Sequence, residues 1–193
     1  LAAISACDPA GRLWVGTSHP PAGRGSGSLY CLPAGGVPRK AALVDLACDS
    51  LAWDRTGRVL YCVHSSLRQV VAYRADPESG RLTQRRTVLK LPTGPDLPRG
   101  VTLDAEGKLW IAHWQGGRVS RWDPATGSCL AEIPVPAPGV TGCVFGGEDL
   151  ATLYITTARR GLAPAELEAA PRAGGVFSCR PGTRGIPGNC SAA

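Results

Sequence analysis

One sequence pattern occurs four times along this chain. It consists of a short apolar segment, a tight turn that contains glycine, and a second apolar segment. The clearest copy has residues 101–103, the turn Asp104-Ala105-Glu106-Gly107 and residues 109–114. The turn glycine accepts a positive φ without steric cost, and the flanking segments are rich in the β-branched and aromatic residues of strands. Each copy therefore predicts two strands joined by a turn.

The copies recur at a regular distance. The four turns begin at Asp8, Asp54, Asp104 and, less clearly, Gly146, which are 46, 50 and 42 positions apart. A third apolar segment follows each copy, and a fourth follows the first three copies. The third segments are residues 29–32, 70–73, 119–122 and 176–179, and the fourth segments are residues 41–46, 86–91 and 129–135. Residues 181–188 contain too much proline and glycine to supply a strand to the last copy.

Four strands per repeat, at a period in the mid-forties, are typical of the blades of a β-propeller. We therefore predict an all-β fold with about four blades in one domain. The predicted domain covers residues 1–193, with repeats at 1–46, 47–96, 97–138 and 139–193.

The composition agrees with short strands and many turns. Glycine accounts for 25 of the 193 residues and proline for 17, and only residues 163–170 suggest a helix. No segment approaches the roughly 18 apolar residues of a membrane-spanning helix, so we expect no contact with a membrane. Because the sequence contains no methionine, we also expect it to be part of a longer product.

The cysteines and the charge bear on location and partners. Four of the eight cysteines lie in apolar segments: Cys31, Cys62, Cys143 and Cys179. This favours buried, reduced thiols over disulfides, and it predicts a cytoplasmic protein. The net charge is +6, but the basic residues are scattered, and the densest pair is Arg85-Arg86. A nucleic-acid surface needs clustered basic residues, so we expect a solvated surface and no nucleic-acid partner.

Equivalent residues in the first strands of a propeller's blades meet at the mouth of its central channel. The residue five positions before each turn is Ala3, Asp49, Arg99 or Thr141. Converging side chains at a concave opening are the default position for a binding site. We expect any chemistry of this chain to lie at this ring of four residues.

Other conspicuous residues have structural explanations. His64 and His113 end the second strands of their repeats without a second ligand at a suitable spacing, so we expect them to be packed rather than metal-bound. The glycine-rich residues 23–28 precede a strand instead of a helix and are interpreted as a loop. The tryptophans are expected to pack within blades rather than to form a sugar platform. They are Trp14, Trp53, Trp110, Trp114 and Trp122.

Seven segments carry motifs of one known family. They are residues 8–12, 51–54, 100–112, 116–127, 145–147, 153–159 and 168–177. With these segments the chain resembles the family of regucalcin (senescence marker protein), gluconolactonase and luciferin-regenerating enzyme, over essentially its whole length. That family has a six-bladed propeller. The resemblance implies that this chain corresponds to the C-terminal two thirds, about four blades, and that two N-terminal blades are absent from the sequence.

The resemblance also implies a chemistry. A divalent cation, calcium or zinc, would polarise the carbonyl of a sugar lactone at the mouth. The family holds this cation with a glutamate from its first blade, an asparagine and an aspartate. The asparagine position matches Asp49, the aspartate position matches Arg99, and the glutamate falls in a blade that the sequence lacks. The family's sugar-binding arginine and asparagine match Leu1 and Ala3, and a further family aspartate matches His64.

Arg99 is the largest departure from the family pattern. A guanidinium cannot coordinate a cation and stays charged at physiological pH. At an effective dielectric constant of about 20, it would repel a dication about 5 Å away by on the order of 6 kcal/mol. We expect Arg99 either to pair with Asp49 across the mouth or to point into solvent.

Two functions therefore remain open. The first is a calcium-binding or zinc-binding hydrolase of sugar lactones such as gluconolactone, impaired at Arg99, with Asp49 as the remaining metal ligand and no catalytic residue assigned. The second is a non-catalytic, truncated propeller that acts at most as a binding module. The sequence identifies no protein partner.

Overall fold

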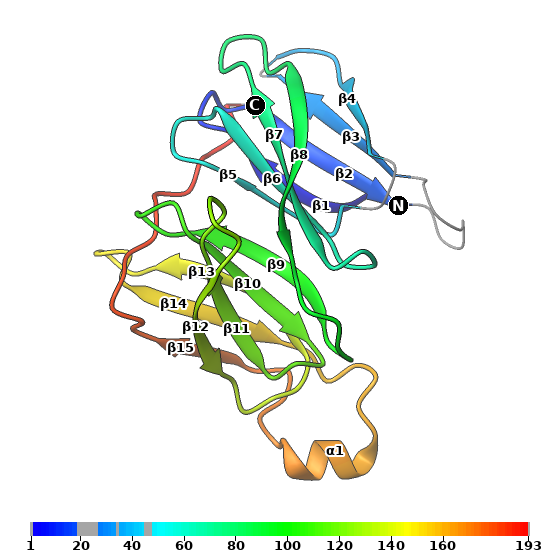
Figure 1. Ribbon diagram of the computed structural model, residues 1–193, viewed down its shortest axis with the longest axis vertical. Coiled ribbons are helices and arrows are strands. Elements are labelled where there is room, and N and C mark those ends of the chain that lie inside the picture. Colours follow the sequence, from blue (N-terminus) through cyan, green and yellow to red (C-terminus); the bar gives the residue numbers. More distant parts are fainter. Residues whose placement is uncertain (1, 19–26, 34, 45–47, 193) are drawn as a thin grey trace. The chain divides into compact units, whose positions relative to one another are not determined.

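The computed structural model is built from four antiparallel sheets, one for each predicted repeat (Figure 1). It describes residues 2–18, 27–33, 35–44 and 48–192. Leu1, Leu46 and most of the segment 23–28 lie outside this range. The chain divides into a first unit, Leu1–Lys90 with Pro187–Ala193, and a second unit, Leu91–Ile186. The single domain over residues 1–193 stays a prediction.

The first unit contains two four-stranded sheets. Within each sheet the strands pair in sequence order, and every pair is antiparallel. One sheet has β1 (Ala2–Cys7), β2 (Leu13–Ser18), β3 (Gly27–Leu32) and β4 (Arg39–Val44), and the other has β5 (Ser50–Trp53), β6 (Val59–His64), β7 (Gln69–Ala75) and β8 (Leu82–Lys90).

The second unit repeats this arrangement with one strand fewer. Its sheets have β9 (Leu97–Leu103), β10 (Leu109–Trp114), β11 (Arg118–Trp122) and β12 (Cys129–Pro134) in one, and β13 (Val140–Gly146), β14 (Thr152–Thr157) and β15 (Val176–Cys179) in the other. The fourth sheet therefore has three strands among the described residues, as the sequence predicts. The four-bladed, propeller-like arrangement is confirmed.

The first strands of neighbouring blades lie beside each other in both units. β1 contacts β5 in the first unit, and β9 contacts β13 in the second. Two glycines allow a close approach of β9 and β13, because a Cβ atom added to Gly100 would lie 2.5 Å from the Cα of Gly142. Any side chain at Gly100 would therefore push β9 and β13 apart. In each unit, the first strand of one blade therefore lies against the first strand of the next.

A buried aspartate organises the turn of the third blade. One carboxylate oxygen of Asp104 accepts hydrogen bonds from the backbone N–H groups of Glu106 and Lys108, at 3.0 and 2.9 Å. The other accepts the indole N–H of Trp110 at 3.0 Å. Asp8 and Trp14 repeat this pair in the first blade at 2.9 Å. The repeat is thus an aspartate followed six residues later by a tryptophan, which ties the turn to the blade core.

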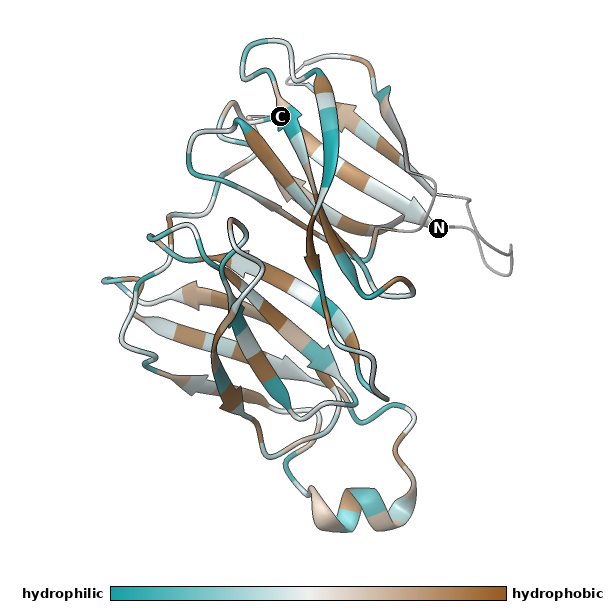
Figure 2. Ribbon diagram, viewed as in Figure 1, coloured by the Kyte–Doolittle hydropathy of each residue, from teal (hydrophilic) through white to brown (hydrophobic). Residues whose placement is uncertain are grey.

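Four of the five tryptophans are buried, as predicted: Trp14, Trp53, Trp110 and Trp122. Trp114 is half-buried. Trp14 and Trp53 pack with ring centroids 5.1 Å apart in the first unit. Trp110 meets Phe145 edge to face at 5.7 Å in the second unit, where it joins the third blade to the fourth. Figure 2 shows the matching alternation of hydrophobic and hydrophilic residues along the strands. Aromatic pairs of this kind stabilise a fold beyond the area they bury.

The helix and the C-terminal segment also occupy defined positions. The helix α1 (Pro164–Ala169) forms within the predicted residues 163–170. In the second unit, Gly185 forms a bridge with Asp104, and its N–H donates to the carbonyl of Leu150. In the first unit, the N–H of Ala192 donates to the carbonyl of Gly11 at 3.0 Å. No helix in the described part of the chain has the length and apolarity needed to cross a membrane.

For two strands, the sequence predicts a first residue that lies four positions after the observed one. β9 begins at Leu97 instead of Val101, and β8 begins at Leu82 instead of Arg86. Both missed segments contain polar residues or proline, which a search for apolar runs excludes. Pairing of the backbone with the neighbouring strand extends them, because the ladder needs N–H and C=O groups rather than apolar side chains.

The prediction of reduced thiols throughout is wrong. Cys48 and Cys62 form a disulfide with a Cα–Cα distance of 5.8 Å, and six cysteines are free among the described residues. The error has a clear cause, because Cys48 precedes β5 and lies outside the apolar segments, so no partner for Cys62 is recognisable from the sequence pattern. The cytoplasmic location loses the support of the thiols and stays a prediction.

The disulfide should stabilise the first unit measurably. It closes a loop of 14 residues, for which chain entropy gives about 3 kcal/mol. We expect dithiothreitol to lower the melting temperature of the wild type but not that of Cys48→Ala/Cys62→Ala. The matched control is Cys129→Ala, which removes an exposed free thiol and should leave the effect of dithiothreitol intact. Detection of eight free thiols in the denatured, unreduced protein would contradict the bridge.

Candidate functional site

Three of the four predicted mouth residues lie at irregularities in a first strand. In β1 the pairing shifts between Ala2 and Ile4, which makes Ala3 the extra residue. In β13 the shift lies between Val140 and Gly142, which makes Thr141 the extra residue. β-Bulges bend a strand and re-aim its side chains, and they are common beside active sites. The repeat pattern thus selects a position that the backbone itself marks.

Arg99 lies in the corresponding irregularity of β9. Pro98 pairs with His113 and Val101 with Ile111, so β9 has one residue more than β10 in this interval. Arg99 is half-buried. Thr141 lies on β13, the first strand of the neighbouring blade. Arg99 and Thr141 are each followed by a glycine, and the backbones of these two glycines, Gly100 and Gly142, lie very close together in the second unit. That Arg99 and Thr141 form one site stays a prediction.

The side chain of Thr141 is already engaged. Its hydroxyl lies 2.8 Å from the hydroxyl of Thr156 on β14. The Thr156 hydroxyl also donates to the carbonyl of Gly142 at 3.4 Å. Because Thr156 donates to Gly142, the Thr141 hydroxyl donates to Thr156 and can still accept a hydrogen bond, which suits a hydroxylated ligand.

Asp49 directly precedes β5 in the first unit. Its N–H donates to the carbonyl of Val63 at 2.8 Å, and one of its carboxylate oxygens accepts the N–H of Ser65 at 2.9 Å. The carboxylate is thereby oriented by the end of β6, the strand that carries His64. Asp49 belongs to the first unit and Arg99 to the second, so the ion pair between them stays a prediction.

The described residues do not make the cation site that the family resemblance implies. No three His, Cys, Asp or Glu side chains in the described ranges converge to hold a metal ion. The Asp49 carboxylate is partly engaged by Ser65, and a guanidinium stands at the position of the second carboxylate ligand. Calcium or zinc as a cofactor of this chain therefore stays a prediction.

A buried polar network lies on the two strands next to β9 in the same sheet, β10 and β11. His113 is 1% exposed and Ser120 is fully buried. The Nδ1 atom of His113 lies 2.6 Å from the Asp96 carboxylate, and its Nε2 atom lies 2.6 Å from the Ser120 hydroxyl. The indole N–H of Trp122 donates to the same hydroxyl at 2.6 Å. The chain of donors runs from Trp122 through Ser120 and His113 to Asp96, and it is complete when His113 is neutral.

The environment of His113 favours this neutral form. Burial lowers the pKa of His113, while its hydrogen bond to Asp96 opposes the shift. Arg118 donates to the same Asp96 oxygen at 3.0 Å and balances its charge. Protonation would place a second N–H against the Ser120 hydroxyl and break the chain of donors. The network is therefore built around an uncharged imidazole.

The order of Ser120, His113 and Asp96 is that of a hydrolase triad, but its function here is structural. A nucleophilic serine must reach substrate and stand beside an oxyanion hole. Ser120 has no exposed surface, and its oxygen accepts the Trp122 indole. The expectation that His113 is a packed strand residue is confirmed, and so is that for His64, which is 1% exposed.

Comparison with known proteins agrees with the fold and the repeat. Residues 5–159 match the model of the SMP-30/Gluconolactonase/LRE-like region. The chain belongs to this family. Regucalcin of Oryctolagus cuniculus is 38% identical over 187 residues, and regucalcin of Gallus gallus is also 38% identical over 187 residues. Each alignment covers 93% of this chain and 62% of the relative, so this member of the family spans less than two thirds of their length.

Solved structures of the SMP-30/gluconolactonase family have the same fold. A calcium-binding regucalcin from Agrobacterium tumefaciens superimposes with a TM-score of 0.85 at 28% identity, over 96% of this chain and 63% of that structure. A luciferin-regenerating enzyme superimposes with a TM-score of 0.84 at 29% identity, over 98% of this chain and 64% of that structure. The expected family and the regucalcin type of propeller are confirmed.

Sequence reasoning missed the partners of His113. Asp96 precedes β9 by one residue and Ser120 lies on β11, so neither stands at a recognisable spacing from the histidine. A usable signal existed in the alternation of β11, where Ser120 and Trp122 point to the same face. A serine inside an apolar strand needs a partner, and the histidine across the sheet supplies it.

Proposed function

We propose that this chain is a sugar-lactone-directed propeller of the regucalcin and gluconolactonase family whose cation-dependent hydrolysis is impaired. The family includes gluconolactonases, which makes an aldonolactone the expected ligand. The observation that carries the impairment is Arg99, a half-buried guanidinium in the bulge of β9. It occupies the position at which the resemblance implies a metal-binding aspartate.

Charge explains why this one position matters. A carboxylate at residue 99 would attract a dication, whereas a guanidinium repels it by on the order of 6 kcal/mol at about 5 Å and an effective dielectric constant of about 20. Asp49 contributes one carboxylate, which can offset only a comparable amount. Thr141, on the strand beside Arg99, offers a hydroxyl to a sugar. This combination fits a mouth that can bind a lactone but holds a cation poorly.

The test is hydrolysis of glucono-δ-lactone with calcium, zinc or manganese, compared between the wild type and Arg99→Asp. We expect negligible metal-dependent turnover in the wild type and a gain in Arg99→Asp, together with a metal-dependent rise in its melting temperature. Arg160→Asp, an exposed substitution of the same charge in the second unit, should behave like the wild type.

Two results would count against the proposal. Strong metal-dependent hydrolysis by the wild type would show that Arg99 does not impair the site. Absence of any gain in metal binding by Arg99→Asp would show that Arg99 is not the cause of the loss. If neither protein hydrolysed or bound the lactone, the chain would instead be a non-catalytic binding module.

A further inference from the structure

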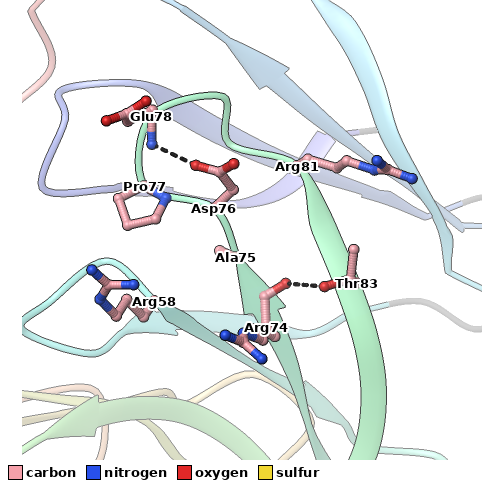
Figure 3. Close-up of a pocket in the computed structure, with 8 residues that line it drawn as sticks. All are labelled: Arg58, Arg74, Ala75, Asp76, Pro77, Glu78, Arg81 and Thr83. Atoms are coloured by element: carbon pink, nitrogen blue, oxygen red, sulfur yellow. Dashed lines mark hydrogen bonds between the residues drawn. The ribbon is translucent and has the colours of Figure 1, made fainter.

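The second blade carries a cavity at the end opposite to Asp49. Asp49 precedes β5, whereas the cavity lies at the turn that follows β5 and at the turn between β7 and β8. Its volume is about 600 Å³, and its lining residues are drawn in Figure 3. A second cavity of about 240 Å³ shares Arg58 and Arg74 with the first and adds Gln84 and Arg86. None of the four predicted mouth residues lines either cavity.

Three guanidinium groups converge here, although they are far apart in the sequence. Arg58 precedes β6, Arg74 lies on β7 and Arg86 lies on β8. Register brings Arg74 and Arg86 to one face of the sheet, since Arg86 pairs with Ala72, two residues before Arg74. Residues two apart on a strand share a face. Arg58 lies at the adjacent turn, where its carbonyl accepts the N–H of Ala75, and it lines both cavities with Arg74. The expectation that the basic residues are scattered is therefore wrong for this blade.

The three positive charges are not neutralised within the described residues. Arg58, Arg74 and Arg86 are all exposed, and none of them forms an ion pair with a carboxylate in the described parts of the chain. Like charges that face each other on a sheet repel and destabilise it. By contrast, Arg12, Arg118 and Arg121 each have a carboxylate partner. A bound anion would supply the missing partner in the second blade.

The opposite wall of the larger cavity is acidic and held in place. One carboxylate oxygen of Asp76 accepts the backbone N–H groups of Glu78 and Ser79, at 2.9 and 3.3 Å. The carbonyls of Pro77 and Glu78 accept the guanidinium of Arg12 at 2.7 and 2.8 Å. This turn is thus preorganised, and preorganised walls reduce the entropy cost of binding.

We propose that this cavity of the second blade binds the phosphate monoester of a small polyhydroxylated molecule, such as a sugar phosphate. The planar fork of arginine matches phosphate oxygens, and three unpaired guanidinium groups suit a dianion better than a single carboxylate. The carboxylates of Asp76 and Glu78 accept hydrogen bonds from the hydroxyls of the sugar. A volume of about 600 Å³ lies in the range of small-molecule sites.

The wall chemistry agrees with this arrangement. Hydrogen bonds from the backbone N–H groups of Glu78 and Ser79 hold the pKa of Asp76 below its usual value, so Asp76 stays an ionised acceptor. In Figure 3 the side chain of Arg81 points away from Arg58 and Arg74. The phosphate would therefore lie beside Arg58 and Arg74, next to Arg86, and the hydroxyls would lie toward the turn between β7 and β8.

The test is isothermal titration of the full chain with glucose 6-phosphate, and separately with inorganic phosphate, glucose and gluconate. We expect glucose 6-phosphate to bind most tightly, with an affinity that falls as salt is added. Arg74→Ala and Arg58→Ala should each weaken it roughly tenfold or more, as expected for loss of charge-assisted hydrogen bonds. The matched control is Arg85→Ala, which removes an exposed arginine of β8 that lines neither cavity and should leave the affinity unchanged.

The contrary outcomes are distinct. Equal weakening by Arg85→Ala would reduce the binding to net charge and overturn the site. Equal affinity for gluconate would overturn the choice of phosphate, and equal affinity for inorganic phosphate would overturn the role of Asp76 and Glu78. Failure of glucose 6-phosphate to bind wild type, with an unchanged melting temperature, would overturn the proposal. Because Arg99 is not involved, Arg99→Asp should bind glucose 6-phosphate like the wild type.

Discussion

Asp104→Ala is expected to lower the free energy of unfolding by about 3–5 kcal/mol, the range for a broken buried ion pair. The Asp104 side chain has no exposed surface and lies 2.7 Å from the guanidinium of Arg121. The same carboxylate receives the indole N–H of Trp110 and two backbone N–H groups of its own turn. Removing it leaves four donors without their acceptor, one of them charged. Urea denaturation, followed by circular dichroism, measures the loss.

The matched control for this prediction is Asp123→Ala. Asp123 is also the first residue of a turn in the third blade, and it accepts the N–H of Ala125 and the ammonium of Lys108. It lies near the surface, where solvent replaces lost hydrogen bonds, so a much smaller loss of stability is expected. A similar loss in the two variants would show that burial of Asp104 does not determine its importance.

His113→Ala is expected to destabilise the chain by about 3 kcal/mol, because it creates a cavity and orphans buried polar groups. Ser120→Ala leaves the Trp122 indole without its acceptor and His113 without its donor, and about 2 kcal/mol is expected. His113, Ser120 and Trp122 belong to one network. The double variant His113→Ala/Ser120→Ala should therefore lose less stability than the sum of the losses in the two single variants. A double-mutant cycle by urea denaturation provides the measurement. Strict additivity would contradict the network.

The network also predicts a dependence on pH. The pKa of His113 is lowered in the folded chain, chiefly by burial. Below its ordinary value of about 6.5, the unfolded chain therefore binds a proton that the folded chain does not. Stability from this histidine is fully present above that pH and is lost as the pH falls below it. The decline between pH 7 and pH 5 should be smaller in His113→Phe, and an equal decline in both proteins would show that another group is responsible.

The sequence predicts the blades better than their edges. Each turn is a local signal, because an aspartate, a glycine and the strands on either side lie within about ten residues of one another. Strands such as β8 are set by backbone pairing with a neighbour, and the residues Thr83–Thr87 are polar and exposed. The Cys48–Cys62 disulfide depends on the same non-local information, since Cys48 lies outside any apolar segment.

The predicted mouth residues show the same difference between local sequence signals and non-local contacts. Counting back from the turns selects Ala3, Arg99 and Thr141, and the structure marks all three with irregular pairing. What the count cannot supply is the partner of each side chain, as for Asp49, whose carboxylate receives the N–H of Ser65. The arginine cluster of the second blade was missed for the same reason, because Arg58, Arg74 and Arg86 come together only through non-local backbone pairing.

Arg12 couples the unfolding of the two blades of the first unit. Its guanidinium is bound to Asp8 in the first blade and to the carbonyls of Pro77 and Glu78 in the second. Neither blade can open at this end without releasing the same side chain. Native-state hydrogen exchange should therefore report one cooperative opening for both blades, and Arg12→Ala should split it into two steps of unequal protection.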